Sequence, residues 1–597
     1  MKKVILFLCF NTMCIFFVKA QWSVIGDDST KQVRWNLVQK FTPEAWNASN
    51  FATKSEMEWF NAARYGMFIH FGLSTYVGKD LSWGVNQTRK APDRGKGPIP
   101  DSVWTTYPQY FNFPNFDARK WVEIAKRAGM QYIVTIAKHH DGFHLWDTDF
   151  SDFKVTNTPF GRDYLKEIAD ACHEAGMKFG IYYSQRDWYH PDYAPVDPSL
   201  IEVVEEAPYF KPKPGVKKVL PGPRHKKYIE YQYNVVRELC TKYGKIDVFW
   251  FDASWWGGMF TADMWDSENL TRMIRELQPG IIINNRASIP GDFDTPEQKI
   301  GMYQERPWES CITLSGSWSW SNSPVKSKKT LIQMLTNTAC GNGNMLLSWG
   351  PRWEGHFEPS QVNRLEEVGD WLKQYGHTIY NTKGGPWYPG SWGGSTSRGN
   401  KVFVHITSDT DSLLELPLLK NKIVALKSLT GEKVNFIQDN NKVRIDFNKK
   451  PLDQPSIIIE LEFKDEILGM ANNKSQNLGF ADPIYGNIIL KNEHLGSKGG
   501  QITVDLGQVY TVTGIDVANA KIGTSGIFAV EVSTDKISWK KIEEFKAELR
   551  RKDVIVAQFN AGIELPGVPA RYMRLSLKGG KDKDYKLDHL YIYGKND

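Results

Sequence analysis

The chain has 597 residues, too many for one ordinary domain, so its length predicts three or four folded units. The formal net charge is +6, and it becomes +3 if a leader containing Lys2, Lys3 and Lys19 is removed. This near balance of charge argues against a nucleic-acid or other polyanionic partner.

Residues 1–20 predict a secretory signal peptide. Lysines at the start precede an apolar stretch, and the small residue Ala20 stands before Gln21. We expect an exported product, either periplasmic or secreted. The rest of the chain has no apolar run of membrane-spanning length, so no membrane partner is expected. Wide, unpaired spacing predicts buried free thiols for the remaining cysteines, which are Cys172, Cys240, Cys311 and Cys340.

Residues 21–385 predict a (β/α)₈ barrel. From Tyr65 to about Gly385, short apolar runs alternate with amphipathic helices, which is typical of βα units around a parallel sheet. The expected strands are 67–70, 132–136, 179–182, 246–252, 281–284 and 345–348. The clearest expected helices are 117–129, 163–176, 226–244 and 331–340. Closure of the barrel is an inference, because it needs two less distinct strands, near Cys311 and near Ile379.

Two all-β units are expected after the barrel. Residues 386–465 alternate apolar and polar side chains between Gly and Asn turns, which predicts a small antiparallel sandwich. A polar joint at 470–477 leads into the unit of residues 466–597, which shows the same alternation. The predicted fold class is therefore α/β: a TIM-like barrel followed by two small antiparallel β-sandwich domains.

Polar side chains stand at five consecutive strand ends of the predicted barrel. A barrel brings the carboxyl ends of its strands to one face, so we expect these groups to share a pocket. Imidazole, phenol, carboxylate and guanidinium groups together suit the hydroxyls of a monosaccharide. Taken singly, each also has a structural interpretation. The residues are His70, the pair His139 and His140, Tyr182, Asp252 and Arg286.

Asp252 ends an apolar strand, where desolvating an unpaired carboxylate costs several kcal/mol. Trp250 precedes it, and Trp255 and Trp256 follow. Aromatic rings beside carboxylates are typical of sites that hold the apolar faces of sugars during glycosidic cleavage. This flank favours a catalytic role for Asp252 over a turn-capping role.

The barrel region resembles glycoside hydrolase family 29, the α-L-fucosidases. The likeness covers roughly residues 55–385. Members of this family are retaining exo-glycosidases, and we expect neither a cofactor nor a metal. The motifs that carry the likeness are Met67 to Gly72, Ala137 to Phe143, Phe179 to Ser184, Trp250 to Asp252 and Gly341 to Pro351.

The resemblance implies that Asp252 is the nucleophile. The acid/base is the least constant position of the family. We favour Glu297, because a proline-set turn after the fifth strand can hold its carboxyl over the pocket, with Glu309 as the runner-up. Phe71 stands where relatives often have Trp, which keeps an aromatic wall. The resemblance implies substrate contacts for His70, Trp83, His139, His140, Tyr182, Trp250 and Arg286.

The last unit resembles the discoidin-like modules that include many family 32 carbohydrate-binding modules. The likeness rests on Ile502 to Val517, the turn Ser533 to Trp539, and Ala570 to Leu575. Its opening segment is short against that pattern. A structural role is as well supported as glycan binding.

The expected substrate is a fucosylated oligosaccharide or glycoconjugate. Three alternatives stand beside the fucosidase. One is a related exo-glycosidase acting on a galacto-configured sugar, and another is a non-catalytic glycan-binding protein. The third is a metal-dependent hydrolase built on His139, His140 and Asp252.

Overall fold

The computed structural model describes residues 51–597 apart from 88–94, 96, 194–200, 204–216, 220–222, 253–261, 299, 301–302, 322–324, 390–391, 408–411, 441, 448–453, 471–486, 499, 519–525, 548–559, 579–585 and 597. The expected signal peptide therefore lies outside the described residues. Within these ranges, none of the helices has the length and apolar character needed to cross a bilayer. The four cysteines of this part are free and buried, which confirms their prediction.

A seven-stranded parallel sheet forms the centre of the first unit, in the order β10-β11-β1-β4-β5-β8-β9. Its strands are almost entirely buried, as expected for a parallel sheet with helices on its outer face and side chains filling its interior. The strands are β1 (Tyr65–Ile69), β4 (Tyr132–Lys138), β5 (Lys178–Ser184), β8 (Val248–Asp252), β9 (Ile282–Ile283), β10 (Glu309–Thr313) and β11 (Asn344–Trp349).

Residues 292–298 connect the two outer strands of this sheet, β9 and β10. The backbone N–H of Asp292 donates to the Ile283 carbonyl on the β9 side. On the β10 side, the N–H groups of Glu309 and Cys311 donate to the carbonyls of Asp294 and Pro296. An irregular segment thus takes the place of an eighth strand, and the curled sheet fits a TIM-like barrel.

The prediction of a strand near Cys311 is confirmed, because β10 lies there. The prediction of a strand near Ile379 is wrong. Ile379 follows a short 3₁₀ helix, η6 (Gly376–Thr378), and its buried side chain belongs to the apolar core. An apolar residue that packs after the end of a helix has the same local pattern as one in a short buried strand. The sequence pattern does not separate the two.

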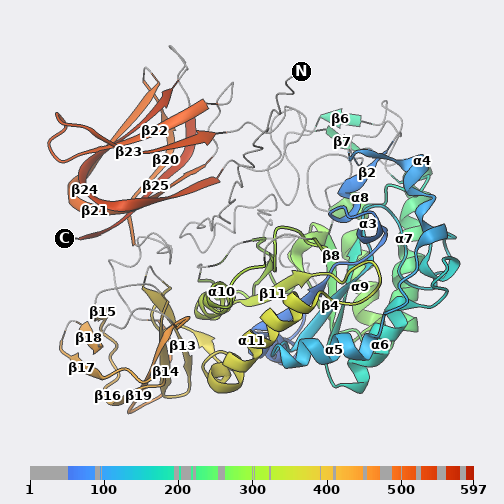
Figure 1. Cartoon of the computed structure of the whole chain (residues 1–597), viewed down its shortest axis with the longest axis horizontal. Helices are drawn as coiled ribbons and strands as arrows, with labels where there is room; N and C mark the ends of the chain where they lie inside the picture. Colours follow the sequence, from blue (N-terminus) through green and yellow to red (C-terminus); the bar gives the residue numbers. More distant parts are fainter. Residues whose placement is uncertain are drawn as a thin grey trace, which may run out of the picture.

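Helices cover the outside of the parallel sheet (Figure 1). The four predicted helices are confirmed, although their ends differ by a few residues. Two of them begin at aspartate caps, where the Asp117 and Asp163 carboxylates accept from the N–H groups of Lys120 and Lys166. The longer helices are α2 (Lys54–Ala63), α5 (Ala118–Arg127), α6 (Tyr164–Glu174), α7 (Pro223–Lys242), α9 (Ser267–Leu277), α10 (Lys328–Cys340) and α11 (Pro359–Tyr375), and α3 (Leu73–Tyr76), α4 (Asp101–Trp104) and α8 (Ala262–Trp265) are single turns.

The second unit consists of two antiparallel sheets around one apolar cluster. Both sheets contribute to that cluster, for example through Val404 and Ile445. The five-stranded sheet holds β12 (Lys383–Gly384), β13 (Gly393–Arg398), β14 (Lys401–Ile406), β19 (Ile457–Phe463) and β16 (Ile423–Ser428). The three-stranded sheet holds β15 (Leu413–Pro417), β18 (Lys442–Phe447) and β17 (Val434–Gln438).

The third unit is a six-stranded antiparallel sheet, drawn in orange and red in Figure 1. It has an apolar cluster of its own. The stretch Ile502 to Val517, which carried part of the discoidin-like resemblance, lies within one long strand, β21, whose register is irregular between Asp505 and Tyr510. The strands are β20 (Asn487–Gly496), β25 (Lys586–Asn596), β21 (Gln501–Ala518), β24 (Asn560–Lys578), β22 (Gly526–Ser533) and β23 (Lys540–Ala547).

Candidate active site

The strand ends that carried polar residues in the sequence converge on one face of the barrel. His70 follows β1, and His139 and His140 follow β4. Tyr182 and Asp252 are near or at the ends of β5 and β8. Arg286 lies in η5 (Asn285–Ala287), a turn of 3₁₀ helix directly after β9. Contacts among these side chains show that they form one site.

Asp252 sits at the centre of this group, with its side chain 15% exposed. The Tyr182 hydroxyl donates to Asp252 Oδ2 at 2.8 Å. The Arg286 guanidinium donates from Nη1 to Asp252 Oδ1 at 3.2 Å. Both carboxylate oxygens therefore accept a hydrogen bond, and one of these bonds comes from a cation. This pairing compensates the desolvation of the carboxylate.

Arg286 links two carboxylates. Its Nη2 donates to Glu297 Oε2 at 3.1 Å while Nη1 holds Asp252. The guanidinium is fixed from behind, because Nε donates to the Thr295 hydroxyl at 2.9 Å and Nη2 also donates to the Thr295 carbonyl. Its central carbon lies 4.6 Å from the ring centroid of Trp250. These contacts leave the guanidinium little freedom, so the two acids are held in a defined relative position.

Glu297 is the more open of the two candidate acids, with its side chain 33% exposed. The pKa of its carboxyl is raised, first because desolvation disfavours the charged form and then because Asp252 lies nearby. Arg286 opposes this rise. Glycosidases separate a proton donor from a nucleophile by placing two carboxyl groups in different environments, one of which raises a pKa.

Glu309 lies deeper, at the first position of β10, and is fully buried. The Tyr132 hydroxyl donates to one of its oxygens, and the Trp250 indole N–H donates to the other at 2.9 Å. Burial raises the pKa of this carboxyl to about 7. The protein's own donors thus occupy both oxygens of Glu309, inside the barrel and away from its rim.

The three histidines are buried and neutral. Burial lowers the pKa of His70 to about 3 and holds those of His139 and His140 well below the ordinary value. No local sequence pattern indicates the side chains that hold these rings, because they lie in separate strands and loops. Hydroxyl groups contact Nδ1 of each histidine, and they belong to Ser348, Ser82 and Ser184.

Aromatic side chains line the same region. The Trp83 side chain is 48% exposed, and its ring centroid lies 5.4 Å from that of His140. Trp250 is buried and stacks on Tyr182 with ring centroids 5.6 Å apart. Trp318, which no sequence motif indicated, has its ring centroid 5.3 Å from that of His70. Trp255 and Trp256 lie outside the described residues.

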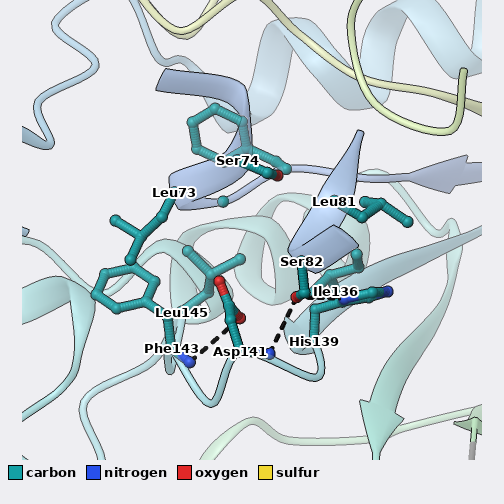
Figure 2. Close-up of a pocket in the computed structure, with 11 residues that line it drawn as sticks. Leu73, Ser74, Leu81, Ser82, Ile136, His139, Asp141, Phe143 and Leu145 are labelled. Carbon is teal, nitrogen blue, oxygen red and sulfur yellow. Dashed lines mark hydrogen bonds between the residues drawn. The ribbon is translucent and has the colours of Figure 1, made fainter. Parts of the chain in front are cut away.

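A small cavity lies behind His139, on the side of Ser82 (Figure 2). Most of its lining is apolar, and Ser74, Ser82, His139 and Asp141 add polar groups. Burial raises the pKa of the Asp141 carboxyl to about 6. The Trp104 indole donates to this carboxyl at 3.1 Å, and the Asp141 N–H donates to the Ser82 hydroxyl at 3.0 Å. These contacts support the turn that carries His139 and His140.

The metal-site alternative has a geometric basis. One ligand atom each from His139, His140 and Asp252 lies within 4.8 Å of the other two. The same Asp252 carboxylate also accepts from Tyr182 and Arg286, so the cluster fits an organic substrate bound through hydrogen bonds as well as it fits a cation. The distances alone favour neither one.

Known proteins similar to this chain help to decide between a metal site and a sugar site. A profile of the α-L-fucosidase family matches residues 31–377, more than half of the chain. The chain belongs to the α-L-fucosidase family. It is accordingly a glycoside hydrolase, as the sequence motifs predicted. Human plasma α-L-fucosidase is 28% identical over 347 residues, which cover 54% of this fucosidase and 69% of that protein. The α-L-fucosidase of Dictyostelium discoideum is 23% identical over 453 residues, covering 68% and 92%.

Solved fucosidase structures share the fold. Isoenzyme 1 from Paenibacillus thiaminolyticus is 33% identical with a TM-score of 0.58, covering 69% of this fucosidase and 99% of that chain. A family 29 enzyme from Bacteroides thetaiotaomicron, solved as a trapped covalent intermediate, has a TM-score of 0.58 at 24% identity and covers 69% and 97%. The fucosidase of Vibrio sp. strain EJY3 has a TM-score of 0.60 at 22% identity and covers 92% and 99%, so this likeness extends beyond the barrel.

Proposed function

We propose that this fucosidase is a retaining exo-enzyme that releases terminal α-L-fucose from glycans, with Asp252 as nucleophile and Glu297 as acid/base. The observation that carries the proposal is the Arg286 guanidinium, which binds Asp252 through Nη1 and Glu297 through Nη2. One rigid cation thus positions both acids of the required pair. Retaining glycosidases hold two such carboxyl groups about 5 to 5.5 Å apart.

The reaction has two steps. In the first, an Asp252 oxygen attacks the anomeric carbon while protonated Glu297 gives its proton to the leaving oxygen, which breaks the glycosidic bond and forms a fucosyl ester. In the second, the Glu297 carboxylate takes a proton from water as that water attacks the anomeric carbon and releases Asp252. Two inversions leave the configuration of the sugar unchanged.

Glu297 is preferred over Glu309 because of their surroundings. A general acid must reach the leaving oxygen, and the Glu297 side chain is partly exposed beside Asp252. Glu309 is fully buried and accepts from Tyr132 and Trp250. We assign it a structural part in which it orients the Trp250 ring beneath Arg286.

His70, His139, His140, Tyr182, Trp83, Trp250 and Arg286 are proposed to surround the bound fucose. Neutral imidazoles, a phenol and a guanidinium supply directional partners for the hydroxyls, and Trp83 offers an exposed ring for an apolar face. A galacto-configured sugar remains the alternative substrate. A metal-dependent reaction on the histidine pair is the second alternative, and it predicts that a chelator abolishes activity.

The accessory assignments are also proposals. Residues 1–20 would direct export, and the unit of residues 386–465 would be a β-sandwich. The third unit would be a discoidin-like module. In its turn from Ser533 to Trp539, the Asp535 carboxylate accepts from the N–H groups of Ile537 and Ser538 and closes the loop tightly.

The test compares Asp252→Asn, Glu297→Gln and Glu309→Gln on an aryl α-L-fucoside and on a fucosylated oligosaccharide. Asp252→Asn lowers kcat at least about 10³-fold on both. Glu297→Gln loses about 10²- to 10⁴-fold on the oligosaccharide, whose poor leaving group needs the acid, and it retains the first step on the activated aryl fucoside. Azide then intercepts the fucosyl-enzyme and gives fucosyl azide of retained configuration.

The same set of variants defines failure. The acid/base assignment is wrong if Glu309→Gln, rather than Glu297→Gln, shows the selective loss and the azide product. Inversion of the fucose first released, read by proton NMR, refutes the retaining mechanism. A chelator that abolishes activity restores the metal alternative, and folded wild-type protein inactive on both substrates points to a galacto-configured sugar.

A further inference from the structure

Two histidines of the site are held at Nδ1 by serines that also contact a carbonyl. The Ser348 hydroxyl lies 2.8 Å from His70 Nδ1, and the Ser184 hydroxyl lies 2.5 Å from His140 Nδ1. All four residues are buried. Neither serine binds the sugar in the proposed function, so both stand behind the site.

The protons in these contacts can be assigned. Ser348 donates to the Trp318 carbonyl at 3.1 Å, and Ser184 donates to the Arg186 carbonyl at 2.9 Å. A carbonyl only accepts hydrogen bonds, and a hydroxyl has one proton to give. Each serine hydroxyl therefore donates its proton to the carbonyl and accepts a hydrogen bond from the histidine N–H. Nδ1 carries the hydrogen in both rings, and a neutral imidazole then has a lone pair at Nε2.

We propose that Ser184 and Ser348 are positioning residues that fix His140 and His70 in the Nδ1–H tautomer, so that each Nε2 accepts a hydrogen bond from a hydroxyl of the bound sugar. The inference rests on the proposed function and adds the direction of two substrate hydrogen bonds. It requires a ligand with free hydroxyls at both positions. Hydrogen or fluorine there has no proton to donate.

The assignment places two hydrogen-bond acceptors side by side, at His140 and Asp252. His140 Nε2 lies 3.9 Å from Asp252 Oδ2. Burial keeps the pKa of His140 well below its ordinary value, so this contact joins a neutral ring to a carboxylate. Both atoms are then acceptors. A sugar hydroxyl satisfies either of them by donating its proton, whereas a sugar ring oxygen does not.

His139 serves as a contrast. The Ser82 hydroxyl lies 2.6 Å from its Nδ1 and accepts a hydrogen bond from the Asp141 N–H. Figure 2 shows Ser82 beside both His139 and Asp141. The bonds described for Ser82 do not include donation to a carbonyl, so its proton is not committed in the same way. The proposal accordingly concerns His70 and His140.

The first test measures competitive inhibition constants of L-fucose and of analogues in which one hydroxyl at a time is replaced by fluorine. In the wild-type enzyme, fluorine at the hydroxyl that faces His140 weakens binding about 10-fold or more, as does fluorine at the one that faces His70. In Ser184→Ala, the His140 Nδ1 loses its acceptor, and the Nε2–H tautomer becomes accessible. The loss of affinity caused by fluorine at the hydroxyl that faces His140 then falls to less than about 3-fold.

Ser348→Ala lowers in the same way the loss of affinity caused by fluorine at the hydroxyl that faces His70. Ser184→Thr and Ser348→Thr keep the hydroxyl and restore the wild-type pattern of penalties. Ser395→Ala is the matched control, because this buried serine also donates to a carbonyl, that of Trp387, but lies in β13 of the second unit. It leaves every penalty unchanged. Penalties in Ser184→Ala and Ser348→Ala that equal those of the wild type overturn the proposal.

A second measurement does not require altered serines to fold. Nitrogen-15 NMR of histidine-labelled wild-type enzyme distinguishes protonated from unprotonated ring nitrogens, and His70→Asn and His140→Asn assign the two signals. Nε2 without a proton in both rings supports the proposal, and an Nε2–H in either overturns it. The tautomers are read without turnover, so failure of this inference is distinguishable from absence of fucosidase activity.

Discussion

Three carboxyl groups in one barrel differ in what surrounds them. Asp252 accepts from a phenol and a cation, Glu297 shares that cation at the edge of the site, and Glu309 accepts from neutral donors in the interior. A cation favours the charged form of a carboxyl, and burial favours the neutral form. In the proposed mechanism, the identity of the neighbour therefore decides which carboxyl group attacks the sugar, which donates a proton and which has a structural part.

The raised pKa of Glu297 predicts the alkaline limb of the pH profile. The acid must be protonated for the first step, so kcat/KM on an oligosaccharide falls as pH rises through this pKa. The raised value moves that fall above the ordinary glutamate range. Glu297→Gln removes the limb in whatever activity remains on an aryl fucoside, whereas Glu309→Gln keeps it. An unchanged limb in Glu297→Gln contradicts the assignment.

Glu309 predicts a pH dependence of stability. Its pKa is about 7 in the folded chain and about 4.5 in the unfolded chain. Between these values only the folded state holds the proton, so the stabilisation is complete below about pH 4.5 and is lost as pH rises to about 7. The free energy of unfolding changes by about 3 kcal/mol over this window.

Urea unfolding of the wild-type enzyme and of Glu309→Gln at pH 5 and pH 8 measures this effect. The amide introduced by Glu309→Gln does not titrate, so the difference between the two pH values becomes smaller by about 3 kcal/mol. Equal pH dependence in the wild type and Glu309→Gln contradicts the prediction.

At the scale of elements, the loop after β5 is fastened to β4 and α7. Lys138 of β4 donates to the Arg186 carbonyl at 3.0 Å and pairs with Asp187 at 3.3 Å, and both charged side chains are almost fully buried. Tyr231 of α7 donates to the same Asp187 carboxylate. This network fixes the carbonyl on which the Ser184 proton depends.

Asp187→Ala therefore destabilises the barrel. Removing one partner leaves the Lys138 ammonium buried without its counter-charge, which costs about 3 to 5 kcal/mol. Thermal or urea unfolding measures the loss. Glu174→Ala is the control, because its pair with Arg119 is exposed and contributes little. A similar small effect for both variants shows that the buried pair is not needed.

At the scale of the molecule, the second unit is tied to the barrel. The Gln333 amide of α10 donates to the carbonyls of Thr407 and Pro455, and the Thr396 hydroxyl donates to the Thr378 carbonyl. Ile458 of β19 belongs to the apolar cluster of the barrel. The third unit instead has an apolar cluster made only of its own residues.

Truncated chains test whether the barrel needs the second unit and can do without the third. A chain ending at residue 468 keeps the barrel and the second unit, and we expect its kcat/KM on an aryl α-L-fucoside to stay within about two-fold of the full chain. A chain ending at residue 385 exposes the apolar face of α10 and is expected to aggregate. Soluble, active protein from the shorter chain, or inactive protein from the longer one, contradicts this division.

Much of this arrangement was predictable from local patterns. Apolar runs and amphipathic stretches located the strands and helices, because both patterns depend on side chains close together in sequence. The polar strand ends then predicted a shared pocket, because parallel strands end at one face. The strand near Ile379 was wrong, since a buried residue after a helix has the same local pattern.

The sequence by itself determined the barrel, the β-rich units that follow it, and which polar residues stand at the strand ends. Only the tertiary structure decided how those residues contact each other. The segment 292–298 brought Glu297, rather than Glu309, to the cation that holds Asp252. Ser184 and Ser348 met histidines 44 and 278 residues away. Such contacts depend on the register of strands and the course of irregular loops, which the packing of the whole core fixes and no local pattern encodes.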